Sequence, residues 1–89
     1  MKAFLVSLNG TRVCLAGLND ASVMGMALDT TPQRGLKLNV GGLDAKTNEF
    51  VRWDTPQVNV GDELTIKIVE VDAVDPESAR YLGTDEHGE

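Results

Sequence analysis

The sequence predicts an all-β protein, a small antiparallel β-sandwich or partly open barrel of about six strands. Three observations support this fold class. Short runs of alternating apolar and polar residues recur along the chain, turn-forming residues separate these runs, and no long segment has helical periodicity. The chain has 89 residues, of which 42% are apolar and 25% charged. Such values are typical of one globular domain and exclude a fully disordered or collagen-like chain.

The first eighteen residues predict a β-hairpin. Asn9-Gly10 is the preferred centre of a two-residue type I′ turn, because both positions of that turn need a positive φ. The residues that this turn would set opposite each other, on one side of the ribbon, are Leu8 and Thr11, Val6 and Val13, and Phe4 and Leu15. The hairpin would place Cys14 on the other side, as a small packed residue.

Four further strands follow from the alternation of side chains. Residues 22–30 carry Met24, Met26 and Leu28 on one side and the smaller Val23, Gly25 and Ala27 on the other. A turn over residues 29–35 leads to a half-buried strand over 36–40, and Gly41-Gly42 either ends this strand or forms a bulge in it. Residues 50–53 form a short strand, and residues 64–71 form the last strand, which is also the most regular.

The composition changes after residue 72 and suggests a different kind of structure. Asp75-Pro76-Glu77 has the pattern of a helix start, with an N-cap, a proline at the first helical position and an acid in the first turn. We therefore expect a β domain over residues 1–72 and an acidic segment over 73–89. That segment would hold a short helix over 75–82 and then a disordered tail.

The formal net charge of −6 is confined to the end of the sequence. Residues 1–69 contain seven acidic and seven basic side chains, whereas residues 70–89 contain seven acidic side chains and Arg80. A neutral body with an acidic tail offers no electrostatic surface for phosphates, so we expect no nucleic acid partner. No stretch approaches the ~20 apolar residues of a membrane span, so we expect no membrane partner either.

The sequence contains no catalytic or metal-binding constellation. Its one histidine, His87, lies in the expected tail, and its one cysteine, Cys14, lies in the first hairpin. Zinc sites and nucleophilic catalysis both need such residues in clusters. We therefore expect a non-enzymatic protein without metal or cofactor, and the lone cysteine favours the cytoplasm as its compartment.

The leading functional hypothesis is a domain that acts through protein contact, as an accessory or homo-oligomeric module. Trp and Arg are enriched at binding hot spots, and methionine suits adaptable surfaces. The candidate contact residues are Trp53, Arg52, Met24, Met26, Asp75, Glu77 and Tyr81. The competing interpretation of Trp53, Met24 and Met26 is that they pack in the core.

Two other functions remain open at this stage. The acidic segment could dock on a basic partner, as in an inhibitor or immunity-type protein, because complementary charge speeds association. Alternatively, Trp53 could serve a small-ligand or carbohydrate-binding module.

Overall fold

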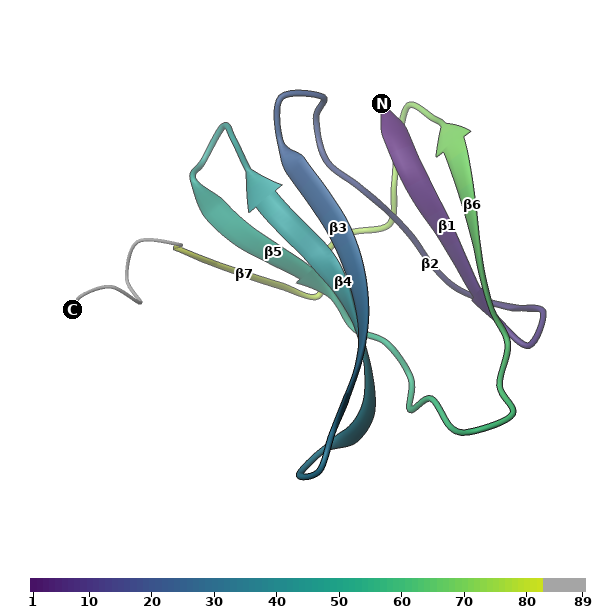
Figure 1. Ribbon diagram of the computed structural model, residues 1–89. Coiled ribbons are helices and arrows are strands. Elements are labelled where there is room, and N and C mark those ends of the chain that lie inside the picture. The colour runs from purple at the N-terminus through teal and green to yellow at the C-terminus, as the bar shows by residue number, and fades with distance from the viewer. Residues whose placement is uncertain (83–89) are drawn as a thin grey trace.

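The protein is a sandwich of two antiparallel sheets, as the computed structural model shows for residues 1–82 (Figure 1). One sheet has three strands in the order β2-β1-β6, and the other has four in the order β3-β4-β5-β7. The strands are β1 (Lys2–Leu8), β2 (Thr11–Gly17), β3 (Val23–Thr31), β4 (Gly35–Asp44), β5 (Glu49–Trp53), β6 (Leu64–Glu70) and β7 (Ala79–Leu82). The prediction of a small all-β sandwich is thus confirmed.

The turn of the first hairpin forms as the sequence predicts, but the register of the strands changes beyond it. Asn9 and Gly10 have φ values of 52° and 83°, and Leu8 lies opposite Thr11. The register then shifts at a bulge, so that Val6 faces Cys14. The expected pairs of Val6 with Val13 and of Phe4 with Leu15 are therefore wrong, as is the expected position of Cys14 on the other side.

The bulge has a clear effect on what the hairpin buries. A bulge leaves one extra residue unpaired in one strand and reverses the side on which the following residues lie. Here the extra residue is Val13, and Cys14 and Ala16 consequently join Val6 and Phe4 on the side that faces the other sheet. Cys14 is 4% exposed and Ala16 is fully buried, so two small side chains occupy the space beneath the four-stranded sheet.

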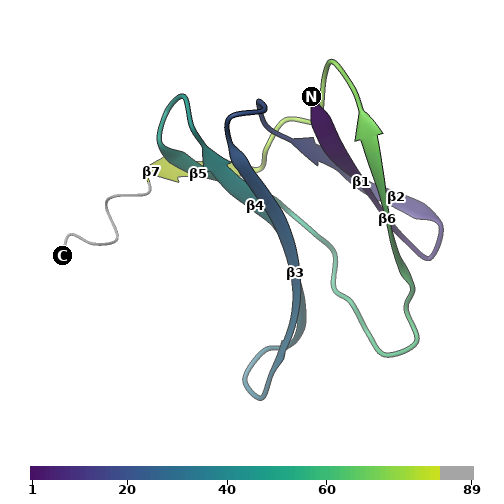
Figure 2. The same cartoon turned by 45° about the horizontal axis from the view of Figure 1, so that its top comes forward.

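The core lies between the two sheets and is mostly aliphatic. Val6, Cys14 and Ala16 from the three-stranded sheet meet Leu38, Val40, Val51 and Trp53 from the four-stranded sheet, together with Val58 from the β5–β6 connection. The hairpin of β3 and β4 is long, and its tip stands apart from the three-stranded sheet (Figure 2).

The helix expected over residues 75–82 is wrong, because Ala79–Leu82 is strand β7, paired with β5. Tertiary hydrogen bonds replace those of a helix. The N–H of Asp75 donates to the Leu15 carbonyl oxygen (2.9 Å), and the N–H of Ser78 donates to the Arg52 carbonyl oxygen (2.7 Å). The Asp75 carboxylate accepts from the N–H of Leu15 (2.8 Å) instead of capping its own segment. The tail expected to be disordered lies outside the described residues.

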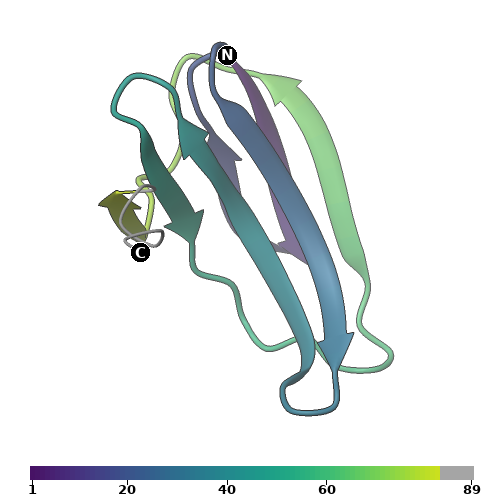
Figure 3. The ribbon, with the colours of Figure 1, turned by 60° about the vertical axis from the view of Figure 1, so that its left-hand side comes forward.

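The connection between β6 and β7 closes one side of the sandwich. It runs beside β2 and also meets the other sheet, because the Trp53 indole N–H donates to the Asp75 carbonyl oxygen (3.0 Å). Edge strands β6 and β3 lie on the opposite side, and β7 lies at the far end of its sheet from β3 (Figure 3).

Steric contact makes glycine necessary at position 42 but not at position 25. A Cβ atom at Gly42 would overlap the carbonyl oxygen of Val23, whereas a Cβ atom at Gly25 would meet nothing within 4 Å. Gly42→Ala should therefore lower the free energy of unfolding by about 2 kcal/mol. Gly25→Ala, the matched control, should change it by less than about 0.5 kcal/mol. Urea denaturation of both variants measures these values, and equal effects would contradict the close approach of β3 and β4.

The contacts of Asp75 predict how stability responds to acid. The N–H of Leu15, and then the guanidinium of Arg12 at 2.7 Å, hold the pKa of Asp75 below its usual range. Because an unfolded aspartate takes up its proton near pH 4, the stability from Asp75 is present above about pH 4 and is lost as the pH falls through its lower folded pKa. Asp75→Asn should lower Tm at pH 7 and make the decline of Tm between about pH 5 and pH 2 shallower. Thermal melts across this range provide the measurement, and the same slope in both proteins would count against this role.

Candidate binding groove

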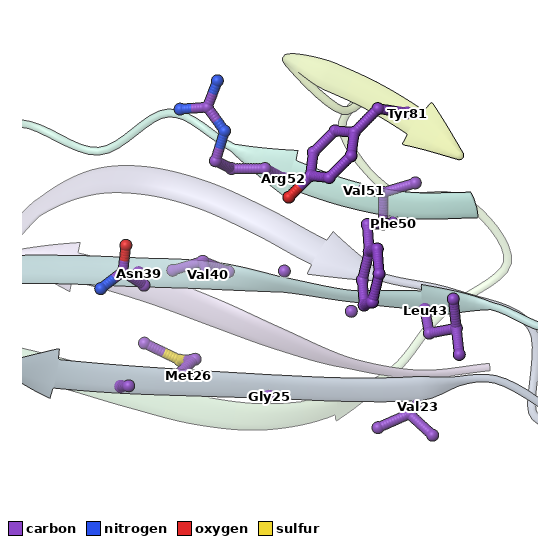
Figure 4. Close-up of a pocket in the computed structure, with 13 residues that line it drawn as sticks. Val23, Gly25, Met26, Asn39, Val40, Leu43, Phe50, Val51, Arg52 and Tyr81 are labelled. Carbon is purple, nitrogen blue, oxygen red and sulfur yellow. The ribbon is translucent and has the colours of Figure 1, made fainter. Parts of the chain in front are cut away.

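The outer face of the four-stranded sheet carries an apolar groove of about 600 Å³. Its wall is a row of side chains that crosses all four strands. Pairing places Val23 beside Leu43, Leu43 beside Phe50, and Phe50 beside Tyr81. Figure 4 shows these four side chains following one another from β3 to β7. We call these residues, with the neighbouring Gly25, Gly41, Asn39 and Arg52, the outer groove.

The bottom of the outer groove is formed by backbone at two positions, because these two residues are glycines without a side chain. Gly25 on β3 lies opposite Gly41 on β4, one row away from the apolar wall. A Cβ atom at Gly41 would overlap the carbonyl oxygen of Val51, so glycine is needed there for the strands to approach. The backbone of the sheet is therefore open to a bound group between the wall and the next side chains along each strand.

The aromatic end of the wall consists of Phe50 and Tyr81. Their ring centroids lie 5.7 Å apart with an angle of 34° between the ring planes, which is a favourable separation for an aromatic pair. Tyr81 is 52% exposed and Val23, at the other end of the row, is 66% exposed. The two ends of the row are thus open to solvent, and Leu43 and Phe50 between them are half-buried.

One cation borders the outer groove. Arg52 shares the row of Gly25 and Gly41, and its guanidinium contacts Asp54 at 3.3 Å. Both side chains are more than half exposed, so this pair contributes little to stability. A guanidinium has five N–H donors, and Arg52 can therefore accept a further carboxylate from a partner. The groove suits the binding of an apolar side chain that lies next to an acidic group.

Three of the seven predicted contact residues, Arg52, Tyr81 and Met26, line this groove. Trp53 does not, because it is 3% exposed and packs in the core, where its N–H is already bonded. Met24 and Met26 are half-buried, and both pack against the core cluster.

Asp75 and Glu77 contribute their carboxylates to contacts within the fold. Asp75 binds Arg12 and Leu15, and Glu77 accepts from Arg80 at 2.9 Å. Arg80 also lowers the pKa of Glu77, as an adjacent cation favours the charged form of a carboxylate. These two acids stabilise the segment that leads to β7 and lie outside the outer groove.

Sequence reasoning missed Val23, Leu43 and Phe50. A signal for Phe50 was present, because residues two apart in a strand share a face and Phe50 is two positions from Arg52. The alternation predicts that Val23, Gly25 and Ala27 share one side of residues 22–30, but it does not indicate that this side remains uncovered. Tyr81 joins the wall only because residues 79–82 form a strand.

A group of charges holds β7 in place at the end of the sandwich. Arg80 contacts Asp44 at 3.0 Å, Glu49 at 2.9 Å and Glu77 at 2.9 Å, and it donates to the hydroxyl of Thr47. Asp44 is 8% exposed, and the N–H of Lys46 followed by Arg80 keeps its pKa below the usual range. Arg80 therefore ties β7 to the β4–β5 turn, on the side of the sheet opposite Tyr81.

Metal ligands are not gathered in the part of the chain that the structure describes. No three His, Cys, Asp or Glu side chains among residues 1–82 are arranged to hold an ion. The acids around Arg80 share that cation and line no part of the outer groove.

Removing the cation of this charge cluster should loosen β7. Arg80→Gln leaves the buried Asp44 and the half-buried Glu49 and Glu77 without their shared positive charge, so the edge strand should open more often. Amide hydrogen exchange over residues 79–82 should become about tenfold faster or more. Arg52→Gln is the matched control, because Arg52 is exposed and points to the other face; equal acceleration in both variants would contradict the assignment.

Comparisons of the chain with protein-family models, with curated proteins and with solved structures give no match in any of the three. Within residues 1–82 there is no helix of the length and apolar character needed to cross a membrane.

Proposed function

We propose that this protein is a non-enzymatic binding module that holds a segment of a partner protein in the outer groove. The observation that carries the proposal is the exposed apolar wall above a floor of glycines. Exposed apolar surface bordered by polar residues is a feature of sites that bind other proteins or ligands. A groove of about 600 Å³ has the size of a pocket that takes a few side chains.

The chemistry of the lining defines the partner segment. Phe50 and Tyr81 offer aromatic surface to an aromatic or branched aliphatic side chain. Arg52 offers a planar cation to an Asp or Glu beside that side chain. We therefore expect a segment in which an apolar residue is next to an acidic one.

The position of other residues favours this function over the two alternatives. A carbohydrate site built on Trp53 loses its support, because Trp53 is buried. An acidic arm loses two of its members, because Asp75 and Glu77 are bonded to Arg12 and Arg80. The surface that remains available for contact is apolar and carries one arginine, which suits a protein segment.

Selection from a random peptide library displayed on phage tests the proposal. Wild-type protein should enrich peptides with an aromatic or branched residue adjacent to Asp or Glu. Tyr81→Ala and Arg52→Glu should each raise the Kd of an enriched peptide about tenfold or more, since both remove a central contact. Fluorescence anisotropy with a labelled peptide measures these constants.

Val60→Ala is the matched control, because Val60 is 96% exposed but lies on the β5–β6 connection away from the groove. It should leave the Kd unchanged. Failure to enrich a common pattern, or full binding by Tyr81→Ala, would overturn the proposed function.

A further inference from the structure

The side of the sandwich between β6 and β3 leaves apolar core-facing residues uncovered. Ile66 lies opposite Val6, and Ile68 lies opposite Phe4, in the β1–β6 pairing. Residues paired across two strands share a face, and Val6 is fully buried in the core. Yet Ile66 is 50% exposed and Ile68 is 70% exposed, because the four-stranded sheet ends at β3 and does not extend over β6.

The opposite side of the sandwich does not have this gap. There the segment that follows β6 runs beside β2 and exchanges hydrogen bonds between Asp75 and Leu15. Among residues 1–82, no segment runs along the outer side of β6 and bonds to it in this way, and β6 pairs only with β1. The two views in Figures 1 and 3 agree that β6 is the outermost strand on its side.

The backbone of β6 presents a free row of donors and acceptors on this side. Met1 and Val71 exchange two hydrogen bonds, and the N–H of Asn9 donates to the Glu63 carbonyl oxygen. Antiparallel hydrogen-bonded pairs recur at every second residue, so the odd-numbered residues of β6 bond to β1. The N–H and C=O groups of Leu64, Ile66 and Ile68 therefore point away from the molecule.

We propose that β6 pairs with β6 of a second copy of this chain, antiparallel, about a two-fold axis through Ile66. This register brings Ile66 beside Ile66, Leu64 beside Ile68, and Thr65 beside Lys67. The outward backbone groups of each copy then bond to those of the other, and the exposed isoleucines cover one another. The two three-stranded sheets become one continuous sheet, so the β6 edge of each copy is no longer free.

Charge disfavours the two registers that are shifted toward the C-terminal end of β6. An axis through Lys67 would set the two Lys67 side chains directly opposite each other, and like charges in that position repel. An axis through Ile68 would place Glu70 against Ile66 on the apolar side, where a carboxylate loses its water. An axis through Ile66 pairs residues 64–68 of the two copies within β6 and has neither defect among them.

Residues 83–89 do not have the chemistry to cover this site. Positions 83–89 consist of glycine, threonine, histidine, aspartate and glutamate, without a large apolar side chain. They also follow the strand at the far end of the other sheet from β3. A second copy supplies what they lack, namely a strand with the same apolar pattern.

Cysteine cross-linking tests the register directly. The Cα atoms of a hydrogen-bonded antiparallel pair lie ~5.5 Å apart, which a disulfide can bridge. In a Cys14→Ala background, Ile66→Cys should form a covalent dimer rapidly under mild oxidation. Ile68→Cys and Lys67→Cys should form it about tenfold more slowly or less, because their Cα atoms lie further from the axis. Fastest cross-linking by either of these variants, or equal rates in all three, would overturn the proposed pairing.

Sedimentation velocity over a range of concentrations provides a second test that does not require a new bond. Wild-type protein should form a dimer, and Ile68→Lys should raise its dissociation constant at least about tenfold, since a charge would enter the apolar contact. Ile68 is 70% exposed, so this variant should keep its fold, as circular dichroism would show. A wild-type protein that stays monomeric up to about 1 mM, at the weak end of specific affinities, would overturn the proposal.

Val23→Lys separates this inference from the proposed function. Val23 is 66% exposed and lies in the wall of the outer groove, on the other sheet. Its substitution should leave the dimer intact while weakening peptide binding, and Ile68→Lys should do the reverse. Loss of the dimer in Val23→Lys would contradict pairing through β6.

Discussion

Asp75 joins the two sheets of this protein, and the position of the outer groove depends on it. Its carbonyl oxygen accepts from Trp53 in the four-stranded sheet, while its N–H and its carboxylate bond to Leu15 in the three-stranded sheet. Because these bonds hold the chain across the side of the sandwich, the following residues reach β5 and pair with it. Tyr81 then lies on the outer face beside Phe50, although Asp75 itself does not line the groove.

The core is small, and apolar surface therefore remains exposed outside it. The buried cluster consists mainly of small aliphatic residues with Trp53 as its one aromatic member. Three strands face four, and the sheets do not cover each other completely. Ile66 and Ile68 on β6, and Val23 and Tyr81 on the outer groove, are among the large apolar side chains left exposed. Uncovered apolar surface and free sheet edges favour association, so both surfaces are natural places for contacts with other chains. They belong to different sheets and can be occupied together.

The candidate site could be predicted from the sequence only in part, and the partial success has a physical explanation. Arg52 was identified from its residue type, and its face follows from the alternation within β5. Tyr81 was also named, but within an expected helix, where it could not have met Phe50. Trp53, like Arg52, is a residue type that is enriched at binding hot spots. Because successive residues of a strand point to opposite faces, Trp53 lies on the other face of β5 and is buried in the core. Residue type indicates which side chains suit an interface, whereas the face that each one occupies depends on which side of the sheet is covered.

Features that depend on near neighbours along the chain follow from the sequence alone. Asn9-Gly10 requires a tight turn, and alternation over five to ten residues defines the strands, because a pleated backbone points successive side chains to opposite faces. The bulge at Val13, the strand formed by residues 79–82 and the outer groove depend instead on the packing of distant segments. These features rest on contacts between residues far apart in the chain, such as Leu15 and Asp75, which are 60 positions apart. A local helix signal at Asp75 is outweighed there, since the hydrogen bonds that would cap a helix are made to another strand.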